Sequence, residues 1–438
     1  MKNKNNQSPH SFTFTSWSMN EKEQGKAIIS SWFTKKDDPS SIDFTLINDE
    51  QSDTSYFELL SNNQRIEIRA SSMEGLFYGF EEYKRNKESS FQQSTCTALV
   101  DERSLLLDIG RKYYSKEWIF SLIDLMSELK LNTLQLHFSD NEGFRIESTS
   151  YPSIVSKEHL KKSEVKEIIS YAKKHYIQVI PELDTPGHLK KFLKKYPQWR
   201  LNRVGKANEF IDYRALDITN SEAVSAIHTL LFEYFDLFRE STYFHLGADE
   251  FIDFDSFHEY PILQETAKKR YGRLATGIEL YIDYTNQLIE EAKKAGFIPR
   301  VWSDGFYRKN QSSIVALSKD VQITYWTRWN EHMSSIDDYL EQGYEVINFN
   351  DNYFYFVLGE AAGYRYPNAE KIRKEWSINL FAGDQKITQA QLSNVIGTSF
   401  AIWSDQPEAL TEEQVMEKLV DPLKAYAEKL WESERRTC

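Results

Sequence analysis

Cysteine is scarce in this chain, which has only Cys96 and Cys438 among its 438 residues. Two cysteines cannot build a disulfide framework or a cysteine-based metal site. Long apolar runs are missing as well, so we expect no membrane-spanning helix. The first seven residues are polar and precede no apolar run, so the sequence predicts no signal peptide and a cytoplasmic protein. A secreted chain whose signal peptide had been removed would show the same pattern.

Positive charge is in deficit, because 53 lysines and arginines face 66 aspartates and glutamates, giving a net charge of −13. This balance argues against nucleic acid or an anionic membrane as the main partner. Aromatic residues, by contrast, reach 14% of the chain, which suits a large core and also a site that stacks against sugar rings. The length fits one large domain and a smaller one, and it leaves the oligomeric state open.

The first 98 residues predict a small α+β domain. Extended segments, which are rich in β-branched and aromatic residues or alternate in polarity, are expected at 11–17, 27–33, 42–47 and 65–70. A helix is expected from Ser71 to about Asn86, on one face of the resulting sheet. Residues 87–98 are polar and weakly patterned, which predicts a linker.

From residue 99 to residue 438 the pattern changes to strand followed by helix, repeated along the chain. Eight apolar strands are expected at 104–109, 133–138, 177–182, 243–246, 299–302, 321–326, 344–350 and 397–403. A helical tail is expected from Glu412 to about Glu432. The alternation predicts a parallel (β/α)8 barrel. An open doubly wound sheet is the alternative, but no glycine-rich phosphate loop follows any of these strands.

The C-terminal ends of the strands carry the chemistry in a barrel of this kind. Here nearly every predicted strand end has a carboxylate, a histidine or a tryptophan. These positions and their neighbours are Arg111, His137, Asp140, Glu182, Asp184, His188, Asp249, Glu250, Trp302, Asp304, Trp326, Asn350, Tyr353, Trp403 and Asp405. Alone, His137 or Trp302 would be interpreted as a core residue. Together, three indoles around carboxylates and one arginine suit a pyranose ring, because indoles hold its C–H faces and charged groups bind its hydroxyls.

Two adjacent carboxylates, Asp249 and Glu250, follow the fourth predicted strand. An isolated pair of this kind more often caps a helix, but the end of a barrel strand is a functional position. Most glycosidases place two carboxylates on opposite faces of the scissile bond. Neighbours along a strand point to opposite sides, so two carboxylates that both reach the site from its end have different jobs. One protonates the leaving oxygen, and the other orients a nucleophile that belongs to the substrate.

Several motifs resemble those of one known family, the family 20 glycoside hydrolases, or β-N-acetylhexosaminidases. His245-Leu246-Gly247-Ala248-Asp249-Glu250 looks like the family signature His-x-Gly-(Ala/Gly)-Asp-Glu. Other segments that are similar to family motifs, in the family's order, are 103–111, 136–140, 181–188 and 301–305. Residues 66–72 and 75–79 resemble the small α+β domain that precedes the family's barrel, and the barrel itself resembles that of compact bacterial members of the dispersin B type.

The resemblance implies a retaining, exo-acting enzyme that releases terminal β-linked N-acetylglucosamine or N-acetylgalactosamine. It implies substrate-assisted catalysis through an oxazolinium intermediate. Glu250 is then the general acid and later the base, Asp249 orients the substrate's 2-acetamido group, and Tyr353 hydrogen-bonds the acetamido oxygen. The implied substrate-binding residues are Arg111, Asp140, His188, Trp302, Asp304, Trp326, Trp403 and Asp405. Neither a metal nor an organic cofactor is expected.

Two positions depart from the family pattern. Asp405 stands where glutamate is common, and the shorter side chain bears on the choice between gluco and galacto sugars. The segment Phe251-Ile252-Asp253 lacks the tyrosine of dispersin-like members, which leaves endo activity open. Two alternative functions also stay open: a divalent-metal-dependent hydrolase with His137 and His188 among its ligands, and a catalytically silent carbohydrate-binding protein.

Overall fold

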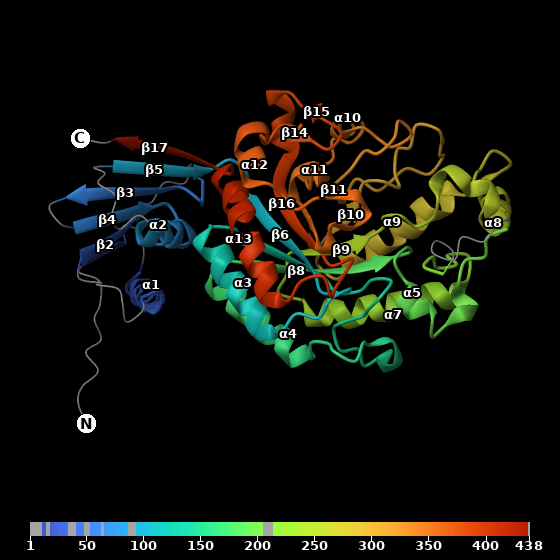
Figure 1. The fold of residues 1–438 in the computed structure, drawn as a ribbon, viewed down its shortest axis with the longest axis horizontal. Coiled ribbons are helices and arrows are strands. Elements are labelled where there is room, and N and C mark those ends of the chain that lie inside the picture. Colours follow the sequence, from blue (N-terminus) through green and yellow to red (C-terminus); the bar gives the residue numbers. More distant parts are fainter. Residues whose placement is uncertain are drawn as a thin grey trace. The chain divides into compact units, whose positions relative to one another are not determined.

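The computed structural model of the chain forms two compact units (Figure 1). It describes residues 11–14, 18–33, 41–47, 53–62, 65–85, 93–204 and 213–436. The first unit is the chain up to Asp101, with Met126–Lys130 and the residues from Ala427 on. The second unit is Glu102–Leu125 and Leu131–Tyr426. Within the described ranges, no helix is both long and apolar enough to cross a membrane.

The first unit is a six-stranded sheet with the strand order β1-β2-β4-β3-β5-β17. Its strands are β1 (Ser11–Phe14), β2 (Ile42–Leu46), β3 (Phe57–Asn62), β4 (Arg65–Ala70), β5 (Gln93–Ala98) and β17 (Trp431–Arg436). Its helices are α1 (Met19–Ser31) and α2 (Met73–Arg85). Helix α2 packs so closely on the sheet that a Cβ at Gly79 would lie 2.5 Å from Ile68 Cγ2. This unit confirms the predicted α+β fold.

Three details of the first unit differ from the prediction. The expected strand 27–33 lies largely in helix α1, because Ser18 and Glu21 form a capping box that starts the helix. The expected linker contains strand β5, which lies between β3 and β17. The expected helical tail ends at Glu428, and β17 follows it. Residues 15–17 and 87–92, which belong to predicted segments, lie outside the described residues.

The two differences that concern β5 and β17 have a common physical cause. Strand β17 pairs antiparallel with β5, from the other end of the sequence. Strand β5 also pairs with β3, a strand that the sequence patterns did not indicate. Polar segments such as 93–98 become strands only when a distant partner supplies the hydrogen bonds, and local propensity does not carry that information.

The second unit is a closed barrel of eight parallel strands. They are β6 (Glu102–Asp108), β7 (Thr133–His137), β8 (Gln178–Thr185), β9 (Tyr243–Gly247), β10 (Ile298–Trp302), β11 (Gln322–Tyr325), β12 (Val346–Asn348) and β16 (Val395–Trp403). Pairing between β12 and β16 closes the barrel and excludes the open sheet. Strand β13 (Tyr355–Val357) adds to the end of β16. The predicted barrel is confirmed.

Helices alternate with the barrel strands and cover their outer faces (Figure 1). The α-helices of this part of the chain are α3 (Lys116–Glu128), α4 (Lys162–Lys174), α5 (Lys190–Leu193), α7 (Ser221–Leu237), α8 (Pro261–Tyr271), α9 (Ile278–Lys294), α10 (Ile336–Leu340), α11 (Asp351–Phe354), α12 (Ala369–Glu375) and α13 (Glu412–Glu428). Short 3-10 helices lie at η2 (Pro152–Ile154), η3 (Pro197–Trp199), η4 (Phe254–Glu259), η5 (Leu358–Gly363) and η6 (Gln389–Asn394). A small ribbon joins β14 (Leu380–Phe381) and β15 (Gln385–Lys386). Every residue of β6, β7, β11 and β12 is buried, as expected for strands covered on both faces.

Candidate active site

Asp249 and Glu250 lie just beyond the end of strand β9, which stops at Gly247. The backbone then takes left-handed values at Gly247 (φ 74°), Ala248 (φ 76°) and Glu250 (φ 42°). Such values are costly for residues with a Cβ and concentrate at functional sites. They break the side-to-side alternation of the strand, so both carboxylates face the same cavity. The Tyr281 hydroxyl holds this turn by donating a hydrogen bond to the Ala248 carbonyl.

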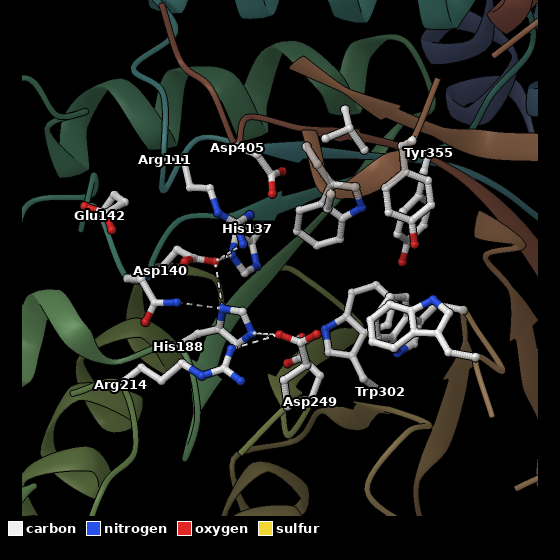
Figure 2. Close-up of a pocket in the computed structure, with 18 residues that line it drawn as sticks. Arg111, His137, Asp140, Glu142, His188, Arg214, Asp249, Trp302, Tyr355 and Asp405 are labelled. Carbon is white, nitrogen blue, oxygen red and sulfur yellow. Dashed lines mark hydrogen bonds and ion pairs between the residues drawn. The ribbon is translucent and has the colours of Figure 1, made fainter. Parts of the chain in front are cut away.

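A cavity of about 340 Å³ opens at this end of the barrel (Figure 2). It is lined by Arg111, His137, Asp140, Asn141, Glu142, His188, Arg214, Asp249, Glu250, Trp302, Trp326, Trp329, Tyr355, Val357, Ala362, Tyr364, Trp403 and Asp405. Most of the predicted site residues are therefore brought together. Five of the strand-end positions, Glu182, Asp184, Asp304, Asn350 and Tyr353, are not among the lining residues, and for two of these, Tyr353 and Asp304, the resemblance implies a role in catalysis or binding.

Glu250 is held from several sides. Arg214 Nη1 lies 2.9 Å from Glu250 Oε2, and His188 Nε2 lies 3.3 Å from the same oxygen. The Glu250 backbone N–H donates to Asp304 Oδ2 at 2.9 Å. Burial opposes ionisation, but the hydrogen bond and charge of His188, together with the charge of Arg214, lower the pKa of Glu250 to about 2. At neutral pH Glu250 is therefore a carboxylate.

Asp249 has a protonated carboxylic acid as its neighbour. Burial and the charge of Asp249 raise the pKa of Asp184 well above its usual range, so Asp184 keeps its proton and hydrogen-bonds Asp249. Gly247 makes this contact possible, since a Cβ there would lie 1.8 Å from Asp184 Oδ1. Asp249 Oδ2 also lies 3.4 Å from His188 Nε2. The orientation of Asp249 is thus fixed by an acid on one side and an imidazolium on the other.

Asp140 anchors the cations on the other side of the cavity. Its Oδ2 lies 2.9 Å from Arg111 Nη2, 2.9 Å from His137 Nε2 and 3.2 Å from His188 Nδ1. Burial favours a neutral carboxyl, but the charges of Arg111 and His188 hold the pKa of Asp140 well below its usual range. Burial likewise disfavours both imidazoliums. The charge of Glu182 raises the pKa of His137, and the charges of Asp140 and Asp249 raise that of His188.

Glu182 closes this network of alternating charges below the cavity. Its Oε2 lies 3.1 Å from His137 Nδ1, and its Oε1 accepts a hydrogen bond from Trp302 Nε1 at 2.7 Å. Burial opposes ionisation, but the charge of His137 lowers the pKa of Glu182 to about 2. A buried carboxylate is stable here because each oxygen has a partner. Glu182 therefore orients the Trp302 indole rather than contacting a ligand.

His245, from the signature segment, is a neutral structural residue. Its Nδ1 accepts the Gly247 backbone N–H at 3.1 Å, and its Nε2 lies 2.8 Å from Thr324 Oγ1. Burial lowers the pKa of His245 to about 4, which keeps the ring uncharged. His245 thus ties the turn before Asp249 to Thr324 of strand β11.

Aromatic rings form the wall next to Asp249. Trp326 and Tyr355 stack in parallel with ring centroids 5.9 Å apart, and Trp302 meets Trp326 edge-on at 6.4 Å. The ring centroids of Trp403 and Trp302 are 6.0 Å apart, and the Arg111 guanidinium carbon lies 5.5 Å from the ring centroid of Trp403. Figure 2 shows Trp302 and Tyr355 at one end of the cavity, and Arg111, Asp140 and Arg214 at the other.

Tyr353 does not occupy the position predicted for it. It lies in the short helix α11, and its hydroxyl is 3.4 Å from Glu375 Oε2. The chain returns to the barrel at β13, which brings Tyr355 to the cavity instead. No sequence pattern distinguished Tyr355 from Tyr353, because only the folded chain shows that a helical turn ends at Phe354 and a strand begins at Tyr355.

Asp304 lies behind the cavity wall. Its Oδ2 accepts the Glu250 N–H, and its Oδ1 accepts the Trp326 indole N–H at 3.1 Å. Burial and the charge of Asp249 raise the pKa of Asp304 to about 7. Asp304 therefore positions two lining residues without itself lining the cavity.

Several lining residues had no sequence signal. Arg214 precedes helix α7 in a segment without periodic pattern, and Asn141 and Glu142 follow the predicted Asp140. Trp329, which is 57% exposed, and Tyr364 lie on loops whose course the local sequence does not indicate. Only the folded loops bring these side chains to the strand ends.

A metal site was one alternative for the histidines and carboxylates. Ligand atoms of His137, Glu182 and Asp184 lie within 4.8 Å of one another, as do those of Asp184, His188 and Asp249. Both ring nitrogens of His137 lie within 3.1 Å of a carboxylate oxygen, and both ring nitrogens of His188 lie within 3.4 Å of one. The histidines and carboxylates of the two groups therefore pair with one another in an ion-pair network.

Residues 102–434 match the catalytic domain of glycosyl hydrolase family 20. The chain belongs to this family. Lacto-N-biosidase of Bifidobacterium bifidum is 26% identical over 389 residues, which cover 86% of this chain and 33% of that protein. The chain thus spans about a third of the length of that family 20 relative.

Two further comparisons support the family 20 assignment. Beta-hexosaminidase subunit A2 of Dictyostelium discoideum is 26% identical over 397 residues, covering 85% of this chain and 69% of that protein. The crystal structure of dispersin B superposes with a TM-score of 0.60 and 26% identity, covering 75% of this chain and 99% of that chain. The family inferred from the motifs is confirmed, as is the likeness of the barrel to that of dispersin B.

Proposed function

We propose that the chain is a retaining, exo-acting β-N-acetylhexosaminidase that uses the substrate's own acetamido group as nucleophile. The observation that carries this proposal is the placement of Asp249 and Glu250 in one cavity, on the same His188 nitrogen. Carboxylates that share one nitrogen do not flank a sugar on opposite faces, as two-carboxylate glycosidases require. The geometry fits two carboxylates with different roles.

Glu250 is the acid and base of this scheme. In the first step it protonates the glycosidic oxygen while the bond between that oxygen and the anomeric carbon breaks. The acetamido oxygen attacks the anomeric carbon, which gives an oxazolinium ion. Water then attacks the same carbon, and the two successive displacements leave its configuration retained. In the second step the Glu250 carboxylate takes a proton from that water. General acid–base catalysis of this kind contributes about 10²–10⁴-fold.

Asp249 faces the acetamido group from its fixed position. As a carboxylate it accepts the acetamido N–H, which raises the nucleophilicity of the amide oxygen and stabilises the charge of the oxazolinium ion. The Asp184 acid and the His188 imidazolium fix its orientation. Burial raises the pKa of Tyr355 well above its usual range, so its phenol stays protonated and can donate to the acetamido oxygen.

The opposite end of the cavity supplies the hydroxyl contacts. Arg111, held by Asp108 at 2.8 Å and by Asp140 at 2.9 Å, presents a fixed guanidinium to the sugar's ring hydroxyls. Asp405 lines the same end, where its short side chain bears on the choice between N-acetylglucosamine and N-acetylgalactosamine. The indoles of Trp302, Trp326 and Trp403 hold the apolar faces of the sugar and its methyl group.

Hydrolysis of aryl glycosides tests this function. We expect release of nitrophenol from the N-acetyl-β-glucosaminide or the N-acetyl-β-galactosaminide, but not from the plain β-glucoside, which lacks the internal nucleophile. Glu250→Gln and Asp249→Asn should each lower kcat by about 10²–10⁴-fold. Glu240→Gln, an exposed carboxylate paired with Lys173, is the matched control and should keep full activity. Equal rates on the glucoside, or full activity of Asp249→Asn, would refute substrate assistance.

A further inference from the structure

Arg214 is a charged residue at the cavity to which the proposed reaction gives no role. Its side chain is buried, with 7% exposed, and its guanidinium reaches the oxygen of the proposed acid at 2.9 Å. The Arg214 carbonyl accepts the Leu189 backbone N–H at 2.9 Å, which ties the residue to the chain next to His188. Figure 2 shows Arg214 beside His188, directed at the Asp249 side of the cavity. A cation in this place opposes the protonation that an acid needs.

We infer that Arg214 is a positioning residue that favours the carboxylate form of Glu250 and thereby lowers the upper pH limit of the enzyme's activity. This inference rests on the proposed function, because it concerns the acid step of that reaction. The guanidinium never loses its charge in a protein, so its contact with Glu250 is present at every working pH. Protonation of Glu250 has to compete with this contact.

The other groups around Glu250 act on it differently from Arg214. His188 also reaches Oε2, and its hydrogen bond and charge lower the pKa of Glu250 together with the charge of Arg214, but His188 is shared with Asp140 and Asp249. Burial, with the charge of Glu250 among the further causes, raises the pKa of both Asp249 and Asp304, so neither neighbour favours the Glu250 carboxylate, and Tyr364 is neutral because burial raises its pKa. Among the described residues around Glu250, Arg214 is thus the positive group that lies nearest to its carboxylate, with His188 as the second. An opposite charge this close lowers a carboxyl pKa by about one to three units.

The test is the pH dependence of kcat/KM, which reports the essential groups of the free enzyme. The substrate is phenyl N-acetyl-β-glucosaminide, or the galactosaminide if that is the better one, because phenol is a poor leaving group that needs the acid. In Arg214→Gln the alkaline limb should move upward by about one to three pH units. At pH values above the alkaline limb of wild type, the kcat/KM of Arg214→Gln should therefore be about 10- to 1000-fold that of wild type. Arg214→Lys keeps the charge and should stay close to wild type.

Controls separate this role from a structural one. The dinitrophenyl glycoside needs no acid, so its alkaline limb should be the same in wild type and Arg214→Gln. Arg270→Gln removes an exposed arginine paired with Asp283 and should leave both profiles unchanged. If Arg214→Gln does not fold, as judged by circular dichroism, Arg214→Met provides a second neutral side chain of similar length.

The outcomes are distinct. An alkaline limb that is the same in the neutral variants and wild type would overturn the inference, and so would an equal displacement with the dinitrophenyl substrate. Failure of the proposed function would show differently, since wild type would then cleave neither N-acetylhexosaminide at any pH.

Discussion

Gly247→Ala tests the contact on which the Asp249 environment depends. Gly247 has φ 74°, and a Cβ there would lie 1.8 Å from Asp184 Oδ1 and 2.7 Å from Asp184 Cα. The second distance involves backbone, so rotation of the Asp184 side chain alone cannot relieve the overlap. Strand β8 or the turn after β9 has to move.

The expected loss has two parts. A left-handed φ costs a non-glycine residue about 1–2 kcal/mol. Forcing a methyl group into a packed interior adds about 1–3 kcal/mol. We therefore expect Gly247→Ala to lower the free energy of unfolding of the barrel by about 2–5 kcal/mol. Displacing Asp184 also removes its hydrogen bond to Asp249, and a misplacement of about 1 Å lowers kcat by about a hundredfold.

Gly343→Ala is a matched control, because Gly343 has φ 79° but no heavy atom within 4 Å of the point where a Cβ would lie. It should lose only the conformational part, about 1–2 kcal/mol, and keep full kcat. Urea unfolding followed by tryptophan fluorescence measures the stability, and nitrophenyl glycoside hydrolysis measures kcat. Equal losses of stability and activity in the two variants would refute the argument that Gly247 is required by Asp184.

Two further predictions concern the tyrosines and the pH dependence of stability. Tyr355→Phe should lower kcat by about a hundredfold, because it removes a donor to the acetamido oxygen, whereas Tyr353→Phe should change kcat less than about twofold. The reverse result would show that Tyr353, and not Tyr355, contacts the acetamido group. Burial holds the pKa of folded His245 at about 4, whereas the pKa of an unfolded histidine is about 6.5. Between these two values the unfolded chain binds a proton at His245 that the folded chain does not bind. The free energy of unfolding should therefore fall as the pH falls through this range, by up to about 3 kcal/mol. Urea unfolding at both ends of this range should show a flatter dependence in His245→Gln, and an unchanged slope would contradict the assignment.

The sequence determined the barrel because its signals are local. Eight apolar strands alternate with amphipathic helices, and strands buried on both faces read as continuous apolar runs. The signature around Asp249 and Glu250 also stands at one strand end, so its place on the functional face followed from the strand alone. Most of the indoles and charged residues of the cavity were found in the same way.

Tertiary structure decided what depends on distant partners or on loop conformation. The pairing of β5 with β17 joins segments more than 300 residues apart, which no local pattern encodes. Arg214 and Tyr364 reach the cavity through irregular loops, and Tyr355 replaces Tyr353 because α11 ends where β13 begins. Charge states are also a property of the fold: Asp184 keeps its proton and Glu250 loses it because burial and neighbouring charges differ at the two carboxyls.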